Sequence, residues 1–115
     1  MHELGIVFHI INQVEKIAVS NQVKEVKKVT LEIGEVSGVV PSYLEDCWQW
    51  ACLHRSEHMK NCELEIITLQ ATSYCEDCKE FYDTVDHGRI CPHCGSRSTY
   101  LVTGNETNIR DIQVV

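Results

Sequence analysis

The sequence predicts an α+β fold: two helices and a small three-stranded sheet, with an inserted four-cysteine zinc-ribbon module. Apolar residues recur with helical spacing over residues 3–20 and 41–54. They alternate with polar residues over 26–34, 62–70 and 107–115, as in half-buried strands. Two Cys-x-x-Cys pairs lie between the second and third of these strands. The chain is therefore expected to leave the main sheet, close around a metal ion and return.

Each predicted helix has one apolar face and a signal at one end. The first helix places its apolar residues at helical spacing: Leu4, Val7, Phe8, Ile11, Val14 and Ala18. Asn21 is its predicted stop. The second helix begins at Pro41, because proline suits the first turn of a helix. Its predicted inner face consists of Leu44, Cys47, Trp48 and Ala51.

The three predicted strands each present one apolar face to the core. The first strand ends at Gly34, and its inward residues are Val29, Leu31 and Ile33. In the second strand the alternating residues are Cys62, Leu64 and Ile66. In the third strand Ile112 and Val114 share a face. Ile109 is out of phase with them, which indicates a bulge or a shifted boundary.

Length, charge and hydropathy limit the possible functions. The 115 residues suit two domains, residues 1–70 with 104–115 and a zinc-binding module at 71–103. A net charge of −7 disfavours nucleic acid as a partner and favours proteins or cations. No run approaches the roughly 20 apolar residues of a membrane span, so no membrane partner is expected. Glu3 stands where a signal peptide would be basic, so a cytoplasmic protein is expected.

Two cysteine pairs, Cys75 with Cys78 and Cys91 with Cys94, are separated by twelve residues. Four thiolates brought together in this way suit a tetrahedral structural Zn²⁺ site. Such a shell leaves no open position for a substrate, so the metal is not expected to be catalytic. The alternatives are two disulfides or a redox-active pair. Three further cysteines are interpreted as small buried apolar residues: Cys47, Cys52 and Cys62.

The amino terminus is a second candidate metal site. His2 has a large side chain and should hinder removal of Met1. The α-amine, the amide nitrogens of His2 and Glu3, and the His2 imidazole could surround one ion in a plane, as Ni(II) and Cu(II) prefer. The first amides of a helix have no intrahelical acceptor, which leaves them free to bind. Taken alone, a histidine at position two more commonly has no metal-binding role.

The order of these motifs resembles a known family. Met1-His2-Glu3-Leu4 opens a helix, Ile33-Gly-Glu-Val-Ser-Gly-Val-Val-Pro41 follows, and the two cysteine pairs come next. This arrangement resembles the HypA/HybF family of hydrogenase-maturation nickel metallochaperones over essentially the whole chain. The resemblance implies delivery of Ni²⁺ for nickel–iron hydrogenase, and in some members for urease, by a protein that is not an enzyme.

The resemblance also implies site residues and partners. Nickel would be held at Met1, His2 and Glu3, and structural zinc by the four paired cysteines. The implied partners are a nickel-handling GTPase of the maturation pathway and the hydrogenase large-subunit precursor. Two rival functions stay open: a zinc-ribbon module that binds proteins or nucleic acid, and a thiol-redox enzyme.

Some histidines depart from the family pattern. Some members carry histidines beside the zinc cysteines, whereas Lys79 and Gly95 follow the two pairs here. His93 lies inside the second pair and is interpreted as a loop histidine. His54 and His58 have helical spacing and are interpreted as part of a frayed helix end, the alternative being a metal bound from one helix face.

Overall fold

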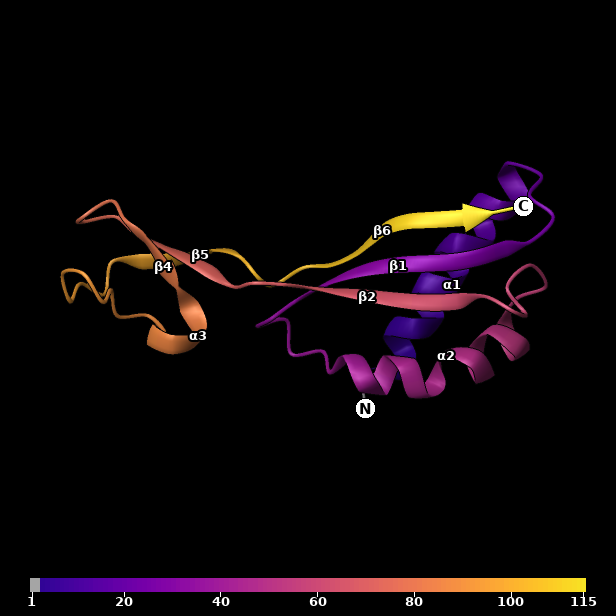
Figure 1. Ribbon diagram of the computed structural model, residues 1–115, viewed down its shortest axis with the longest axis horizontal. Coiled ribbons are helices and arrows are strands. Elements are labelled where there is room, and N and C mark those ends of the chain that lie inside the picture. The colour runs from indigo at the N-terminus through magenta and orange to yellow at the C-terminus, as the bar shows by residue number, and fades with distance from the viewer. Residues whose placement is uncertain (1–2) are drawn as a thin grey trace. The chain divides into compact units, whose positions relative to one another are not determined.

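A computed structural model describes residues 3–115, and its α+β architecture confirms the predicted fold class (Figure 1). In chain order the elements are α1 (Glu3–Ser20), β1 (Val26–Gly34), α2 (Pro41–Arg55), β2 (Glu63–Leu69), β3 (Thr72–Cys75), β4 (Phe81–Asp83), α3 (Thr84–His87), β5 (Thr99–Thr103) and β6 (Thr107–Val114). Within the described part of the chain, no helix combines the length and the apolar character that a membrane crossing requires.

The chain separates into two compact units. The first, here called the helical unit, contains the described residues up to Glu32, together with the segments Val39–Ile67 and Asn108–Val115. The second, here called the cysteine unit, contains Ile33–Gly38 and Thr68–Thr107. The domain bounds predicted from the sequence, 1–70 with 104–115 and 71–103, remain a prediction.

The helical unit is built on a sheet of strand order β2-β1-β6, and α1 runs across this sheet in Figure 1. The predicted helix and strand positions are confirmed to within a residue or two. The fully buried side chains include Val7, Ile11, Val14, Val29, Leu31, Leu44 and Trp48. The Trp48 indole N–H donates to the carbonyl of Cys62 at 3.0 Å, so the buried ring also has its polar atom satisfied.

Three predicted burial positions differ from the structure. Val114 is 49% exposed, whereas Ile109 and Ile112 are the half-buried residues of β6. The reason is that β6 is an edge strand whose end extends beyond the core. The amide of Val115 donates to the carbonyl of Glu25, which precedes β1.

On α2, Cys47 is half-buried and its thiol is hydrogen-bonded to the carbonyl of Tyr43, so the interpretation of this cysteine as a buried residue was wrong. The other two cysteines outside the pairs, Cys52 and Cys62, are fully buried, as predicted.

The cysteine unit has its own antiparallel sheet of order β4-β3-β5, which the sequence analysis did not anticipate. Ser73 of β3 lies opposite Tyr82 on β4 and opposite Leu101 on β5. The short helix α3 follows β4 directly, and the Asp83 carboxylate accepts from the amide of Val85 at 3.3 Å to cap it. These elements place the four cysteines at one end of the sheet.

Candidate metal centre

The four paired cysteines converge in the cysteine unit. All four Sγ atoms lie within 4.8 Å of one another. The Sγ atoms of Cys75 and Cys94 are 3.6 Å apart, as are those of Cys78 and Cys91. Among residues 3–115, this is the one group of three or more histidine, cysteine or acidic side chains whose geometry could hold a metal ion.

Two turns of the same design bring these thiols together. In the first, the amide of Lys79 donates to the carbonyl of Cys75 at 2.9 Å, and the amide of Cys75 donates to the carbonyl of Glu80 at 3.0 Å. In the second, the amide of Gly95 donates to the carbonyl of Cys91 at 2.9 Å, and the amide of Cys91 donates to that of Ser96 at 3.0 Å. Each turn therefore presents its two Sγ atoms to the same side.

The residue after each pair takes a left-handed backbone conformation. Lys79 has φ of 61° and Gly95 has φ of 76°. Glycine adopts this conformation freely, whereas a lysine is strained in it. The residues that follow the two cysteine pairs therefore occupy turn positions set by backbone geometry.

Hydrogen bonds also tie the two turns to each other. The Ser96 hydroxyl donates to the Asp77 carboxylate, and the amide of Glu76 donates to the carbonyl of Ser98 at 2.9 Å. Within the second turn, the amide of His93 donates to the Cys91 sulfur at 3.4 Å. The thiol positions are thus held by the backbone and by side chains outside the cluster, which preorganises the centre.

This geometry fits zinc. A tetrahedral ion with Zn–S bonds of about 2.3 Å has sulfur–sulfur edges of about 3.8 Å, close to the 3.6 Å found for two of the pairs. All seven cysteines are free thiols, so the alternative of two disulfides is contradicted. When zinc is bound it supplies four Zn–S bonds, and with all four positions filled by protein sulfur it has no site for substrate.

The thiols differ in acidity before metal binds. The backbone amide of Cys78 is the main cause that lowers the pKa of Cys75 to about 7. Burial raises the pKa of Cys78 to about 12. A cation in the cage favours the thiolate form of every sulfur, and metal binding therefore releases protons.

Of the three residues predicted to bind nickel, the structure describes only Glu3. Met1 and His2 lie outside the described residues. Glu3 is the first residue of α1 and is 9% exposed. Its amide belongs to the first turn of the helix, where backbone N–H groups have no acceptor within the helix.

The other histidines do not gather into a site. As interpreted from the sequence, a helix end lies between His54 and His58: α2 ends at Arg55 and Ser56 is extended, with φ of −142°, which contradicts the alternative of a metal bound from one helix face. His54 stacks on Trp50 with ring centroids 4.2 Å apart. His93 is exposed on its loop, as interpreted from the sequence.

One polar cluster was missed by the sequence analysis. The Nδ1 atom of His58 lies 2.6 Å from the Glu15 carboxylate, which also accepts from the Ser56 hydroxyl. The cluster joins α1 to the segment after α2. No sequence pattern marks it, because 43 positions separate Glu15 from His58.

Comparison with known proteins gives a consistent result over the whole chain. The family model HypA, described as hydrogenase/urease nickel incorporation metallochaperone, matches residues 1–114. The hydrogenase maturation factor HypA of Geotalea uraniireducens is 33% identical over 115 residues, which cover 99% of each chain. The hydrogenase maturation factor HybF of Klebsiella pneumoniae is 28% identical over 113 residues, which cover 98% of each chain.

Solved structures share the fold. The solution structure of the Ni metallochaperone HypA from Helicobacter pylori superposes with a TM-score of 0.74 at 24% identity, covering 100% of this chain and 98% of that one. A second solution structure of a HypA protein superposes with a TM-score of 0.75 at 26% identity, covering 100% and 97%.

Proposed function

We propose, because this chain belongs to the HypA family of hydrogenase/urease nickel-incorporation metallochaperones, that it holds Ni²⁺ at its amino terminus and passes the ion to a hydrogenase under assembly. The ligands would be the α-amine of Met1, the amides of His2 and Glu3, and the His2 imidazole. Four nitrogens in a plane are the coordination that Ni(II) prefers.

The observation that carries this proposal is the start of α1 at Glu3, in a chain matched by the family from residue 1. A helix start offers amide nitrogens with no competing acceptor, and its dipole favours the deprotonated, anionic form. The buried Glu3 side chain supports a role for the backbone nitrogen of this residue rather than for its carboxylate.

The chemistry of such a protein is ligand exchange and not catalysis. Nickel is its cargo and zinc is its resident metal, held by Cys75, Cys78, Cys91 and Cys94. We assign the cargo to the domain of residues 1–70 with 104–115 and the zinc to residues 71–103. The closed sulfur shell suits a structural role, whereas a chain terminus suits a site that must release its ion.

Membership of the family places the protein in a maturation pathway. Within it, we assign as partners a nickel-handling GTPase and the hydrogenase large-subunit precursor, with urease as a second recipient. The place of action would be the cytoplasm, where such assembly partners meet. A net charge of −7 supports protein partners over nucleic acid.

The test is Ni²⁺ titration of zinc-loaded, untagged protein whose amino terminus has been verified by mass spectrometry. We expect His2→Ala to abolish tight Ni²⁺ binding and leave the zinc content unchanged. One extra alanine before Met1 should do nearly the same, since it converts the α-amine to an amide and shifts the chelate.

His9→Ala is the matched control, because His9 is an exposed histidine of α1 outside the proposed ligand set. It should bind Ni²⁺ like the unchanged protein. If the extended protein binds Ni²⁺ as tightly as the native one, the terminal site is wrong. The histidines His54, His58 and His93 would then be tested individually.

A further inference from the structure

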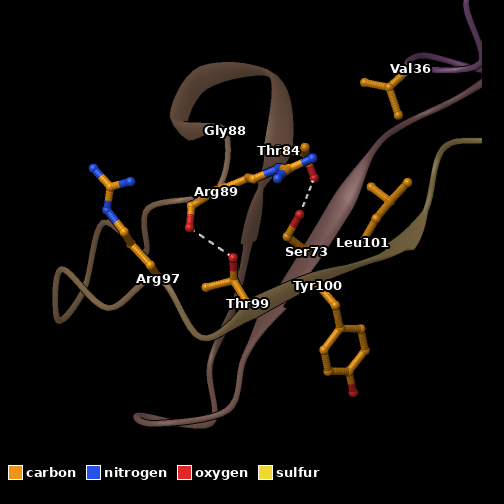
Figure 2. Close-up of a pocket in the computed structure, with 9 residues that line it drawn as sticks. All are labelled: Val36, Ser73, Thr84, Gly88, Arg89, Arg97, Thr99, Tyr100 and Leu101. Atoms are coloured by element: carbon orange, nitrogen blue, oxygen red, sulfur yellow. Dashed lines mark hydrogen bonds between the residues drawn. The ribbon is translucent and has the colours of Figure 1, made fainter.

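The cysteine unit contains a hollow that the metal chemistry does not use. It has a volume of about 580 Å³ and is lined on its polar side by Ser73, Thr84, Arg89 and Arg97 and on its apolar side mainly by Val36 and Leu101 (Figure 2). Volumes of this order are typical of ligand sites. We call it the arginine hollow.

The polar side of the arginine hollow is held in place by hydrogen bonds. The hydroxyls of Ser73 and Thr84 are 2.6 Å apart, and Figure 2 shows the Arg89 side chain extending toward this pair. The Thr99 hydroxyl donates to the carbonyl of Arg89 at 2.8 Å, and the amide of Gly88 donates to that of Thr84 at 2.7 Å. The backbone that carries Arg89 is therefore fixed before any ligand arrives.

The charges of the arginine hollow are not paired with a carboxylate of the described residues. Within residues 3–115, neither Arg89 nor Arg97 makes an ion pair, although acidic residues outnumber lysine and arginine by 17 to 10. By contrast, Lys28 and Arg110 each lie beside a carboxylate. A guanidinium group next to two hydroxyls is suited to bind a carboxylate or phosphate oxygen.

Two observations decide which anion fits better. The net charge of −7 repels polyanions such as nucleic acid, whereas one or two carboxylates meet less repulsion. Val36 and Leu101 are each 39% exposed and provide an apolar wall that a small inorganic anion would leave unused. The ligand should therefore carry both a carboxylate and an apolar group.

The neighbouring strand adds a third feature. In the sheet β4-β3-β5, the edge strand β5 pairs on one side with β3, and among the described residues no strand pairs with its other side. The free backbone groups of an edge strand can pair with an extended peptide. β5 also contributes Leu101 to the hollow, so a peptide on this edge would reach it.

We propose that the arginine hollow docks an acidic peptide segment of a protein partner. One carboxylate of the segment binds Arg89 and the Ser73–Thr84 hydroxyls, and an adjacent apolar side chain packs on Val36 and Leu101. Arg97, whose side chain points away from the hydroxyl pair in Figure 2, contributes longer-range attraction at the rim. The proposal does not depend on where nickel binds.

The test is an NMR titration of the zinc-loaded full chain with the capped peptide acetyl-Val-Glu-Val-Glu-Val-amide. We expect the amides of Ser73, Thr84, Gly88, Arg89 and Leu101 to shift together. The peptide with glutamine in place of glutamate should produce at most weak shifts. Arg89→Gln should weaken binding about tenfold, as expected for the loss of a charge-assisted hydrogen bond. Arg97→Gln should weaken it less.

Arg110→Gln is the matched control, because it removes an arginine from the helical unit, and it should leave the affinity unchanged. Three results of the peptide titrations would overturn the proposal. They are equal binding of the glutamine peptide, unchanged binding by Arg89→Gln, and no shifts up to about 5 mM peptide. A titration with inorganic phosphate is the last arm. Stronger shifts of the same amides by phosphate would assign the hollow to a free phosphate anion instead.

Discussion

Gly34 and Gly104 approach each other so closely that a Cβ atom on Gly34 would lie 2.0 Å from the carbonyl oxygen of Gly104. The same carbonyl accepts from the amide of Val36 at 2.8 Å. Gly104 has φ of 114°, and a Cβ atom there would lie 2.4 Å from the Cα of Ala71. Backbone contacts on both sides therefore require glycine at these two positions of the cysteine unit.

Gly34→Ala should consequently destabilise the protein strongly. Its new methyl group meets backbone atoms, which cannot rotate away as a side chain can. We expect the free energy of unfolding to fall by about 2–4 kcal/mol. Urea unfolding of the zinc-loaded protein measures this. Gly5→Ala is the control: Gly5 lies in α1 with nothing within 4 Å of its added Cβ, and this variant should gain about 0.5–1 kcal/mol. Similar effects of the two variants would contradict the close-approach argument.

Replacing a thiol of the metal centre should release the zinc. Cys75→Ala leaves three sulfur ligands, and we expect zinc content, measured by elemental analysis, to fall from about one ion per chain to near zero. Amide signals of residues 71–103 should broaden or collapse, while those of the helical unit persist. Cys47→Ala is the control: it removes a half-buried thiol of α2 outside the metal centre, and this variant should keep its full zinc content. Full zinc occupancy in Cys75→Ala would refute the four-sulfur site.

The two left-handed turn residues should respond in opposite directions. Lys79→Gly removes a strained side chain from φ of 61°, so zinc release to a chelator should become slower. Gly95→Ala introduces a side chain at φ of 76°, and with no atom within 4 Å of the new Cβ, only backbone strain of about 1 kcal/mol acts. Its zinc release should become faster. Equal rates in both variants would show that φ at these positions does not control the centre.

Local patterns predicted the parts of the fold that local physics determines. The helices α1 and α2 and the strand β1 follow from apolar spacing and from Pro41, all within a few residues. The burial phase of β6 could not be predicted, because it depends on the strand being at an edge of the sheet. The short strands β3 and β4, of four and three residues, are too brief to show an alternating pattern.

The candidate site divides in the same way. The zinc ligands were readable because each Cys-x-x-Cys pair forms within one turn. The contact of Ser73 with Thr84 depends on how β3 and α3 are arranged, and the spacing of these polar residues in the sequence does not predict it. The His54–His58 spacing is also compatible with a shared helix face, and only the structure shows that α2 ends at Arg55, between the two residues. The nickel ligands Met1 and His2 remain a prediction.

Buried thiols should make the stability of the protein fall in alkali. Burial raises the pKa of Cys52 to about 12 and that of Cys62 to about 11. The folded-state pKa of each lies above the ordinary value of 9.0, so each thiol stabilises the fold fully below pH 9. This contribution is lost as pH rises toward the folded-state pKa, because the unfolded chain releases the proton first. At pH 10, Cys52 alone accounts for a loss of about 1 kcal/mol.

Cys52→Ala should therefore unfold at lower urea at pH 8, because packing is lost, yet lose less stability than the unchanged protein between pH 8 and pH 10. Val29→Ala is the control, since it truncates a fully buried side chain that does not titrate. It should lower stability equally at both pH values. Urea unfolding of the zinc-loaded proteins at the two pH values, under reducing conditions, measures the difference. If Cys52→Ala and the unchanged protein lose the same free energy between pH 8 and pH 10, the Cys52 thiol is not the source of the alkaline sensitivity.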